Sequence, residues 1–357
     1  FSEFSDQEYR TRNEWKFDDG EAISGNNTSA AWTDATVEKS MKDRLEEQNI
    51  RSVLLGGESW LDTWTIEYSA GYSEGEEKEP ARLDTEFELE GLDLAYNSVG
   101  EQPDLVPDPA MSDASNFGIK EWVFLDGVAE DTTINGKLDF TKSIFSNAYN
   151  GDLKFGVAVR TREKSYDAET FVYEGPDGLN AQQFANAGPR YGIGTFGPGL
   201  SAGAIRSYFD QNRGSLDIDS DGSLVESLVG DYEMNEDVSA AYLMSHFERS
   251  GLRVVYGVRY EDTEFDATGL RIAVDDVSGS GDPEARAASF TKSYDNLLPS
   301  INVRLERGDF VWRAAATQTI GRPNFGDLSP GGEIEFETDD GENVLSAEVG
   351  NPLLEPV

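Results

Sequence analysis

Apolar and polar residues alternate with a period of two in five separate segments, and this pattern most constrains what the chain can form. In "TWTIEYSAGY", residues 63–72, Trp64 and Tyr68 fall on one face while Glu67 falls on the other. Successive side chains of a β-strand point to opposite faces, so the segment predicts a strand with one apolar face. The other four segments are residues 152–162, 251–262, 297–306 and 310–317. Their repetition predicts an all-β chain.

Short and long connections alternate between these segments. The short ones, typical of hairpin turns, are 56–62, 146–152, 247–252 and 305–310. The long polar ones are 20–35, 78–118, 176–235, 266–290 and 323–357. A transmembrane β-strand needs only about 9 to 11 residues with alternate ones apolar, so a mean hydropathy of −0.52 is compatible with crossing a membrane. The layout predicts an antiparallel up-and-down transmembrane β-barrel, with tight turns at one rim and long loops at the other.

The composition excludes several classes of site. The chain has no cysteine and one histidine, His246, so it can form neither a disulfide nor a conventional zinc centre. Its formal charge of −40, from 29 basic and 69 acidic residues, argues against nucleic acid, which binds basic patches. We find no nucleophile with a supporting base and no phosphate loop, so we predict no catalytic residue and no enzyme activity. His246 is interpreted as a structural or surface imidazole without a titratable partner in a recognisable motif.

Four motifs follow one another in the second half of the chain. They are "YGVRYEDTEFDATG" (256–269), "YDNLLPSINVRLE" (294–306), "FVWRAAATQTIGRPNFGDLSP" (310–330) and "GNPLLEPV" (350–357). In this order they resemble the barrel of a TonB-dependent outer-membrane receptor, in particular the large group common in alphaproteobacteria. The resemblance is tight over 236–357 and weaker upstream. It implies a 22-stranded barrel in the outer membrane of a Gram-negative bacterium, plugged by an N-terminal domain and energised through TonB.

The chain departs from the family pattern at both ends. The plug would precede residue 1, and the family normally continues beyond "GNPLLEP" to a terminal aromatic residue. The opening "FSEFSDQEYR" has no basic region followed by an apolar core, so no signal peptide is predicted there. We count about nine strands. We therefore expect residues 1–357 to be the central part of the barrel domain, an incomplete portion of a presumed 22-stranded barrel, with the plug and the C-terminal strands missing.

Arginine is concentrated on the polar faces of the predicted strands, which is unusual for a solvent-facing surface in so acidic a chain. The predicted lumen-facing arginines are Arg160, Arg162, Arg259, Arg304 and Arg313. Two kinds of partner would satisfy their charge: carboxylates of the plug, or neighbouring lumen carboxylates such as Glu67, Glu261 and Glu306. The sequence leaves both open.

Two loop features are candidate binding sites. The largest predicted loop interleaves aromatic residues with Gly, Asn and Gln, and these could stack on a sugar, grip a chelate or simply pack on their neighbours: Tyr191, Phe196, Tyr208 and Phe209. In "DIDSDGSLVES", Asp217, Asp219 and Asp221 precede Gly222 as in the first half of a calcium loop. The twelfth position is Leu228 where calcium needs a bidentate Glu, so a solvated acidic turn competes with weak extracellular calcium binding. We predict no other cofactor.

The sequence therefore predicts an energy-coupled outer-membrane receptor that imports a scarce nutrient, with oligosaccharide slightly favoured over a siderophore or a cofactor because of the aromatic loop. Its expected partners are outer-membrane lipid, the ligand, and TonB through the plug. Arg322 and Asn324, in "IGRPNFGDL", are further candidates for ligand contact, although an exit turn explains this motif as well. The alternative from another class is a secreted soluble β-protein for adhesion or carbohydrate binding. A passive porin is a third hypothesis.

Overall fold

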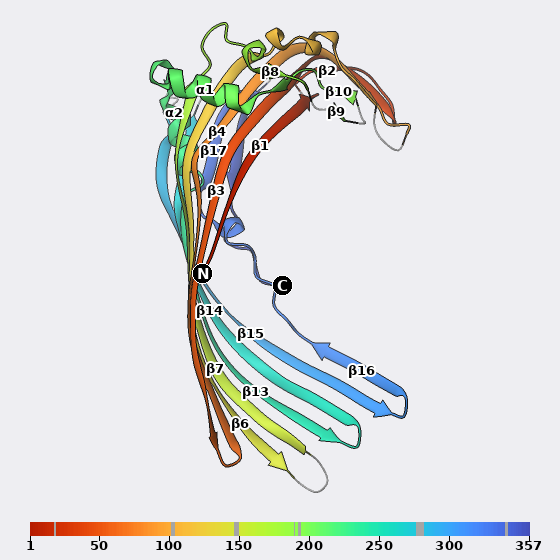
Figure 1. Cartoon of the computed structure of the whole chain (residues 1–357), viewed down its shortest axis with the longest axis vertical. Coiled ribbons are helices and arrows are strands. Elements are labelled where there is room, and N and C mark those ends of the chain that lie inside the picture. The colour runs from red at the N-terminus through yellow and green to blue at the C-terminus, as the bar shows by residue number, and fades with distance from the viewer. Residues whose placement is uncertain are drawn as a thin grey trace.

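The computed structural model describes residues 1–17, 19–100, 104–145, 150–188, 190–191, 194–275, 282–339 and 342–357. Nine long strands form one continuous antiparallel path, which confirms the strand count predicted from the sequence. In sheet order they are β1 (Ser2–Lys16), β3 (Ser29–Leu61), β4 (Trp64–Asn97), β6 (Gly118–Phe145), β7 (Asn150–Glu174), β13 (Tyr232–Arg249), β14 (Leu252–Asp275), β15 (Glu284–Arg307) and β16 (Phe310–Thr317). Figure 1 shows them as a single curved sheet, with tight hairpins at its lower end and helices at its upper end. The sheet does not close on itself.

Shorter strands attach to this path or pair among themselves. Those on the main sheet are β2 (Glu21–Gly25) on β3, β5 (Asp104–Val106) on β4, β12 (Ile218–Asp219) on β7, and β17 (Gly332–Asp339), which pairs in parallel with β14 and antiparallel with β18 (Glu342–Val349). Two small pairs are β8 (Ala185–Asn186) with β11 (Gly199–Leu200), and β9 (Arg190–Tyr191) with β10 (Gly194–Thr195). No helix in the described part of the chain is long and apolar enough to cross a membrane.

The described residues form two α-helices, both in the upper connections: α1 (Ala202–Asn212) and α2 (Ser220–Leu228). The 3₁₀ turns are η1 (Pro109–Ser112), η2 (Ala114–Asn116), η3 (Ala181–Phe184), η4 (Arg213–Ser215) and η5 (Gly326–Leu328). Helix α1 begins after Ser201, whose Oγ accepts a hydrogen bond from the backbone N–H of Ala204 at 3.4 Å, as an N-cap does.

The lower turns follow the prediction in their positions. Between β13 and β14 the two turn residues, Ser250 and Gly251, have φ of 49° and 81°. This left-handed pair is typical of a type I′ hairpin turn and suits glycine. The predicted turn at 305–310 also forms, at 308–309. The predicted turn at 56–62 is tighter than expected, because β3 continues to Leu61 and only two residues separate it from β4. In the fourth predicted turn, residues 146–149 lie outside the described residues.

Several predicted long loops are wrong, because the strands continue far beyond the length that a membrane requires. Strand β4 occupies residues 78–97 of the predicted loop 78–118, and β14 and β15 enter the loop 266–290 from both sides. At about 3.3 Å per residue, a strand the length of β14 reaches about 80 Å, against a hydrocarbon core of about 30 Å. Between Leu83 and Phe87 the period-two pattern continues, but glutamate and aspartate fill the alternate positions and gave the segment the composition of a loop.

One face of the sheet keeps its apolar character from end to end. Strands β6 and β7 pair without a register shift along their whole length, so every second residue stays on the same face. At the lower end this face carries Leu138 and Val157, which are exposed. At the upper end the same face carries Phe124 and Phe171, which pack beneath the helical connections. The protein therefore covers its apolar face with its own chain at the top and leaves it bare below.

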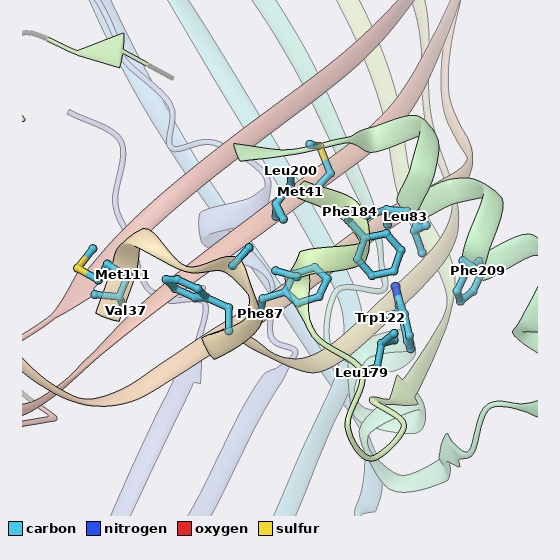
Figure 2. Packing of buried hydrophobic residues seen from close by; sticks show 14 of the residues in the cluster. Val37, Met41, Leu83, Phe87, Met111, Trp122, Leu179, Phe184, Leu200 and Phe209 are labelled. Carbon is cyan, nitrogen blue, oxygen red and sulfur yellow. The ribbon is translucent and has the colours of Figure 1, made fainter. Parts of the chain in front are cut away.

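The upper cluster is the main hydrophobic core, and we call it the cap core. Its larger members are Val37, Met41, Leu83, Phe87, Met111, Trp122, Leu179, Phe184, Leu200 and Phe209, labelled in Figure 2. They come from β3, β4, β6 and β11, from η1 and η3, from α1, and from Leu179 just before η3, so segments far apart in sequence meet there. Trp122 and Phe209 are fully buried. The predicted loop 176–235 is thus largely a folded part of this core.

Candidate functional site

The bare apolar band is confirmed by its exposed side chains. At the lower ends of the strands, many aliphatic and aromatic side chains are at least 36% exposed, among them Tyr68, Tyr72, Ile134, Leu138, Val157, Val159, Tyr256, Tyr260, Leu297, Ile301, Phe310 and Trp312. The opposite face of the same strands carries the arginines. Rows of exposed aliphatic and aromatic residues on one face, backed by charged residues on the other, are the arrangement of a barrel wall between lipid and a polar interior.

The predicted arginines lie on that charged face, and four of the five are paired with carboxylates of the wall. The pairs are Arg160 with Glu236, Arg162 with Asp131, Arg259 with Glu261 and Arg304 with Glu306. Glu67, the third carboxylate named from the sequence, instead accepts a bond from Lys154 at 2.6 Å. Neighbouring wall carboxylates therefore do satisfy most of these arginines. Arg313 has no such pair among the described residues.

Arg313 belongs to a row of like charges at the lower end of the charged face. The strand register places Arg253 opposite Arg304, and Arg304 opposite Arg313, across β14, β15 and β16. The three side chains line a shallow hollow together with Asn302. Like charges directly opposite each other in a sheet are destabilising, so the row presents positive charge that only Glu306 offsets directly.

A cavity of about 510 Å³ lies higher on the same face and is lined by five cationic side chains. The strands β7, β13, β14 and β15 form one side of it, and residues 322–328 and 352–356 form the other. The C-terminal segment that includes these residues crosses the concave side of the sheet in Figure 1. The cations that line the cavity are Arg160, Arg162, Lys164, Lys292 and Arg322. We call this cavity the basic pocket.

Ion pairs hold the basic pocket together. Glu236 is buried and bridges two elements: one carboxylate oxygen contacts Arg160, and the other lies 3.2 Å from Nε of Arg322. Arg322 also donates from Nη2 to Glu261 at 2.7 Å. Arg162 binds Asp131 and lies under the ring of Phe325, with 4.7 Å from its guanidinium carbon to the ring centroid. Pairs of this kind fix the guanidinium groups in place around the cavity.

Sequence reasoning found only part of this pocket. It singled out Arg160, Arg162 and Arg322 but missed Glu236, Lys164 and Lys292. Glu236 begins the segment with the tight family resemblance. Met234 and Val238, two positions before and after it, are apolar and lie on the same face of the strand, which is the buried one. That alternation was the available signal. Lys164 and Lys292 lie outside the alternating segments 152–162 and 297–306, in polar stretches where charge is ordinary.

The aromatic loop residues pack rather than face a ligand, which corrects the first of their two interpretations. Phe209 is fully buried, with its ring 5.3 Å from that of Tyr173, and Tyr208 stacks on Trp122 at 5.9 Å. Phe196 is buried beside Trp15. The Tyr191 side chain lies outside the described part of the structure. The geometry thus favours packing for Phe196, Tyr208 and Phe209.

The three aspartates do not form a calcium site in the structure. The Asp219 side chain caps α2 by accepting bonds from the backbone N–H groups of Asp221 and Gly222. Within the described residues, no three His, Cys, Asp or Glu side chains gather closely enough to hold a metal ion. Asp217 and Asp221 are not brought to Asp219 as ligands. The sequence Asp-Ser-Asp-Gly is explained by the helix cap instead, because an Asp before a helix caps its first backbone N–H groups.

His246 has a partner that the sequence did not reveal. Its Nδ1 lies 3.1 Å from Oδ2 of Asp152, and its Nε2 lies 3.7 Å from Glu248. Asp152 is opposite His246 in the register of β7 and β13. Cross-strand pairing explains the contact as part of the wall.

Comparisons with known proteins agree with this architecture. Residues 80–357 match the family described as "TonB dependent receptor-like, beta-barrel". No curated protein matches the chain. Among solved structures, the closed form of the ferric-catecholate import receptor Fiu from Escherichia coli K12 is similar, with 8% identity, a TM-score of 0.33, and coverage of 85% of this chain and 47% of that one. The unliganded ferric citrate transporter FecA has 12% identity, a TM-score of 0.26, and coverage of 87% and 43%.

The chain spans about half the length of these solved receptors. The narrower likeness to the alphaproteobacterial group stays a prediction. The family match, in contrast, extends from residue 80 to residue 357 and covers well over half of the sequence. The chain therefore belongs to the TonB-dependent receptor-like β-barrel family.

Proposed function

We propose that residues 1–357 form the central part of the barrel of an energy-coupled uptake receptor that imports a scarce nutrient. Membership of the family places the chain in the outer membrane of a Gram-negative bacterium, among transport receptors and not among enzymes. The observation that carries the proposal is the two-faced, nine-stranded wall: one face is bare and apolar at the height of the hairpins, and the other is charged and holds the basic pocket.

The partners of such a receptor follow from the same face. A plug preceding the chain would lie against the charged wall, and the row of Arg253, Arg304 and Arg313 offers it three donors for carboxylates. TonB would act through that plug. Both kinds of partner left open by the sequence therefore keep a place: most of the arginines have wall partners, and this row supports a plug contact.

The identity of the imported nutrient is part of this proposal and does not follow from family membership. Oligosaccharide was slightly favoured because of the aromatic loop, but Phe196 and Phe209 are buried, and Tyr208 is partly buried against the cap core. That argument therefore falls, and oligosaccharide, siderophore and cofactor stand on equal terms as far as the loop is concerned. Calcium has no geometric support beyond the acidic turn at Asp217–Asp221.

A soluble adhesion or carbohydrate-binding protein is the alternative of another class. A soluble sandwich would cover its apolar face with a second sheet, whereas Tyr68, Tyr256 and Trp312 stand exposed on one face by 42% or more. A passive porin shares the wall but needs no energy source. The proposal differs from both in requiring a plug and energised transport.

Two measurements on the complete receptor test the proposed function. Fractionation is expected to place it in the outer membrane and to require detergent for its extraction. Uptake of the cargo is expected to stop when TonB is deleted or a protonophore collapses the proton gradient. Recovery in the soluble fraction would favour the adhesion protein, and uptake that survives loss of TonB would favour the porin.

A further inference from the structure

The basic pocket concentrates positive charge in a protein that has little of it. Five of the chain's 29 basic residues line this one cavity, whereas among the described residues a single acidic one, Glu236, does so. The carboxylates of Asp131 and Glu261 stand just behind the lining and also bind its arginines. Counting all three carboxylates against the five cations leaves a formal excess of two positive charges.

That excess resides on the two lysines. Neither Lys164 nor Lys292 has a carboxylate within ion-pair distance in the described ranges of the chain, and Lys292 Nζ donates only to the carbonyl oxygen of Leu354, at 3.2 Å. Both lysines line the cavity. An ammonium group in a partly enclosed site gains most from a negatively charged partner, because nearby protein replaces the water that would otherwise solvate it.

One guanidinium group also keeps an unused donor. Nε of Arg160 is buried without a hydrogen-bond partner in the described structure, although Nη2 of the same residue pairs with Glu236. A buried donor without a partner costs free energy. A carboxylate or phosphate oxygen in the cavity would supply an acceptor, and a small adjustment of the Arg160 side chain would bring this donor to it.

Apart from Tyr294 and Asn324, the remaining walls are formed by apolar residues and glycine, and they limit the size of an occupant. Phe265, Phe325 and Pro323 contribute to them, and Pro352 and Pro356 stand on the C-terminal side. The volume of about 510 Å³ falls in the usual range of roughly 300 to 1,000 Å³ for small-molecule sites. A compact solute fits this space, whereas a long polymer does not.

We propose that the basic pocket binds a compact polyanion, a solute that carries two or more carboxylate or phosphate groups. The proposal rests on the proposed uptake function and names the chemical class of its cargo. Lys164 and Lys292 select for charge, while Arg160, Arg162 and Arg322 hold the geometry through Glu236 and Asp131. A neutral oligosaccharide would leave both ammonium groups unpaired.

Calorimetry on the complete receptor in detergent tests this assignment. The probes are tricarballylate for carboxylates, pyrophosphate for phosphates and maltotriose as a neutral solute of similar size. We expect one or both anions to bind more tightly than maltotriose, and to bind more weakly at high salt. The anion that binds more tightly shows whether carboxylate or phosphate groups carry the negative charge of the solute.

The diagnostic variant is the double substitution Lys164→Gln and Lys292→Gln. It removes the two unpaired charges and leaves the ion pairs of the three arginines intact, so the fold is expected to persist. Anion affinity is expected to fall at least about tenfold, the effect of losing a charge-assisted bond. The control Lys142→Gln changes the charge equally but lies outside the pocket, over the ring of Trp64, and is expected to bind as the unmodified receptor does.

Any of four results would overturn the assignment. The first is equal anion binding by the double variant and the unmodified receptor, and the second is tighter binding of maltotriose than of either anion. The third is a plug that becomes sensitive to protease in the double variant while no anion binds. This result would mean that carboxylates of the plug occupy the basic pocket. If TonB-dependent uptake persists unchanged in the double variant, the pocket assignment fails while the receptor function stands. If uptake never depends on TonB, the receptor function itself fails.

Discussion

Arg322 and Glu236 lie 3.2 Å apart and join a connecting segment to the wall, because Arg322 precedes η5 while Glu236 belongs to β13. The side chain of Glu236 is 7% exposed and that of Arg322 23% exposed, so water screens the pair only partly. The same guanidinium group reaches Glu261 on β14. One side chain thereby fastens the outer side of the basic pocket to two neighbouring strands.

Substitution Arg322→Gln is expected to loosen this segment. It removes a shared partner from two buried carboxylates and is expected to cost about 1–3 kcal/mol locally. Hydrogen exchange at Leu328 and Ser329, whose amides bond to Phe325 and Gly326, measures the effect. The control Arg286→Gln removes an exposed pair with Glu284 and is expected to change stability by less than about 1 kcal/mol. Equal exchange in the two variants would show that Arg322 is not an anchor.

Phe209 is the residue of α1 on which the cap core most depends. Its ring stacks on Phe124 at 5.7 Å and meets Tyr173 edge-on at 5.3 Å. Substitution Phe209→Ala leaves a cavity and is expected to cost about 3–5 kcal/mol of cap stability. Tryptophan fluorescence reports the change through Trp122, which packs on the same ring at 6.1 Å.

The matched control for the cap is Leu224→Ala, on α2, because Leu224 is 41% exposed. We expect a change within about 0.5 kcal/mol for it. A cap that unfolds at the same denaturant concentration in all three proteins would contradict the role assigned to Phe209.

The two faces of β15 are expected to differ in their tolerance of charge. Ile301 belongs to the bare apolar face and is 43% exposed, whereas its neighbour Ser300 belongs to the charged face. Substitution Ile301→Arg is expected to cost about 2–4 kcal/mol if the residue sits near the midplane of the bilayer, and Ser300→Arg much less. Refolding into lipid vesicles, followed by the gel shift of the folded barrel, compares the two. Equal refolding yields would mean that Ile301 does not face lipid.

Lys39 gives stability a dependence on pH. It lies about 70 Å along β3 from the turn at Leu61, at about 3.3 Å per residue, and so stands well beyond the membrane. Its ammonium group donates to Asn13 Oδ1 at 2.6 Å and to the carbonyl oxygen of Phe196, and lies 4.9 Å from the centroid of the Phe117 ring. None of these partners carries a charge. Burial therefore lowers the pKa of Lys39 from 10.5 to about 8.

The sign of the effect follows from proton uptake. Between pH 8 and pH 10.5 the unfolded chain holds the Lys39 proton while the folded protein releases it, so the cap gains stability as the pH rises through this window. The full gain is about 3 kcal/mol at most. We expect the unfolding free energy of the unmodified protein to rise relative to that of Lys39→Met between pH 7.5 and pH 10. Parallel pH profiles for the two proteins would show that Lys39 does not titrate in this range.

Local pattern alone determined the strand directions, the two faces and most of the hairpins. Period-two alternation is a property of neighbouring residues, so Trp64 and Tyr68, or Ile301 and Ser300, reveal their faces without reference to the rest of the chain. The count of nine strands and the location of Arg160, Arg162, Arg259 and Arg304 on the charged face follow from the same signal. It fails where acidic residues fill the alternate positions, as between Leu83 and Phe87.

Tertiary structure decided how far the strands extend, what covers the upper apolar face and which charges meet. Between β3, β4 and β6 the pairing shifts register near Ala81, whose φ is 52°, and this irregularity turns Leu83 onto the face of Phe124. The basic pocket joins residues of four strands to Arg322, more than 80 positions along the chain from Glu236. Such meetings depend on the pairing of distant strands and on the return of the chain across the sheet, which no local window contains.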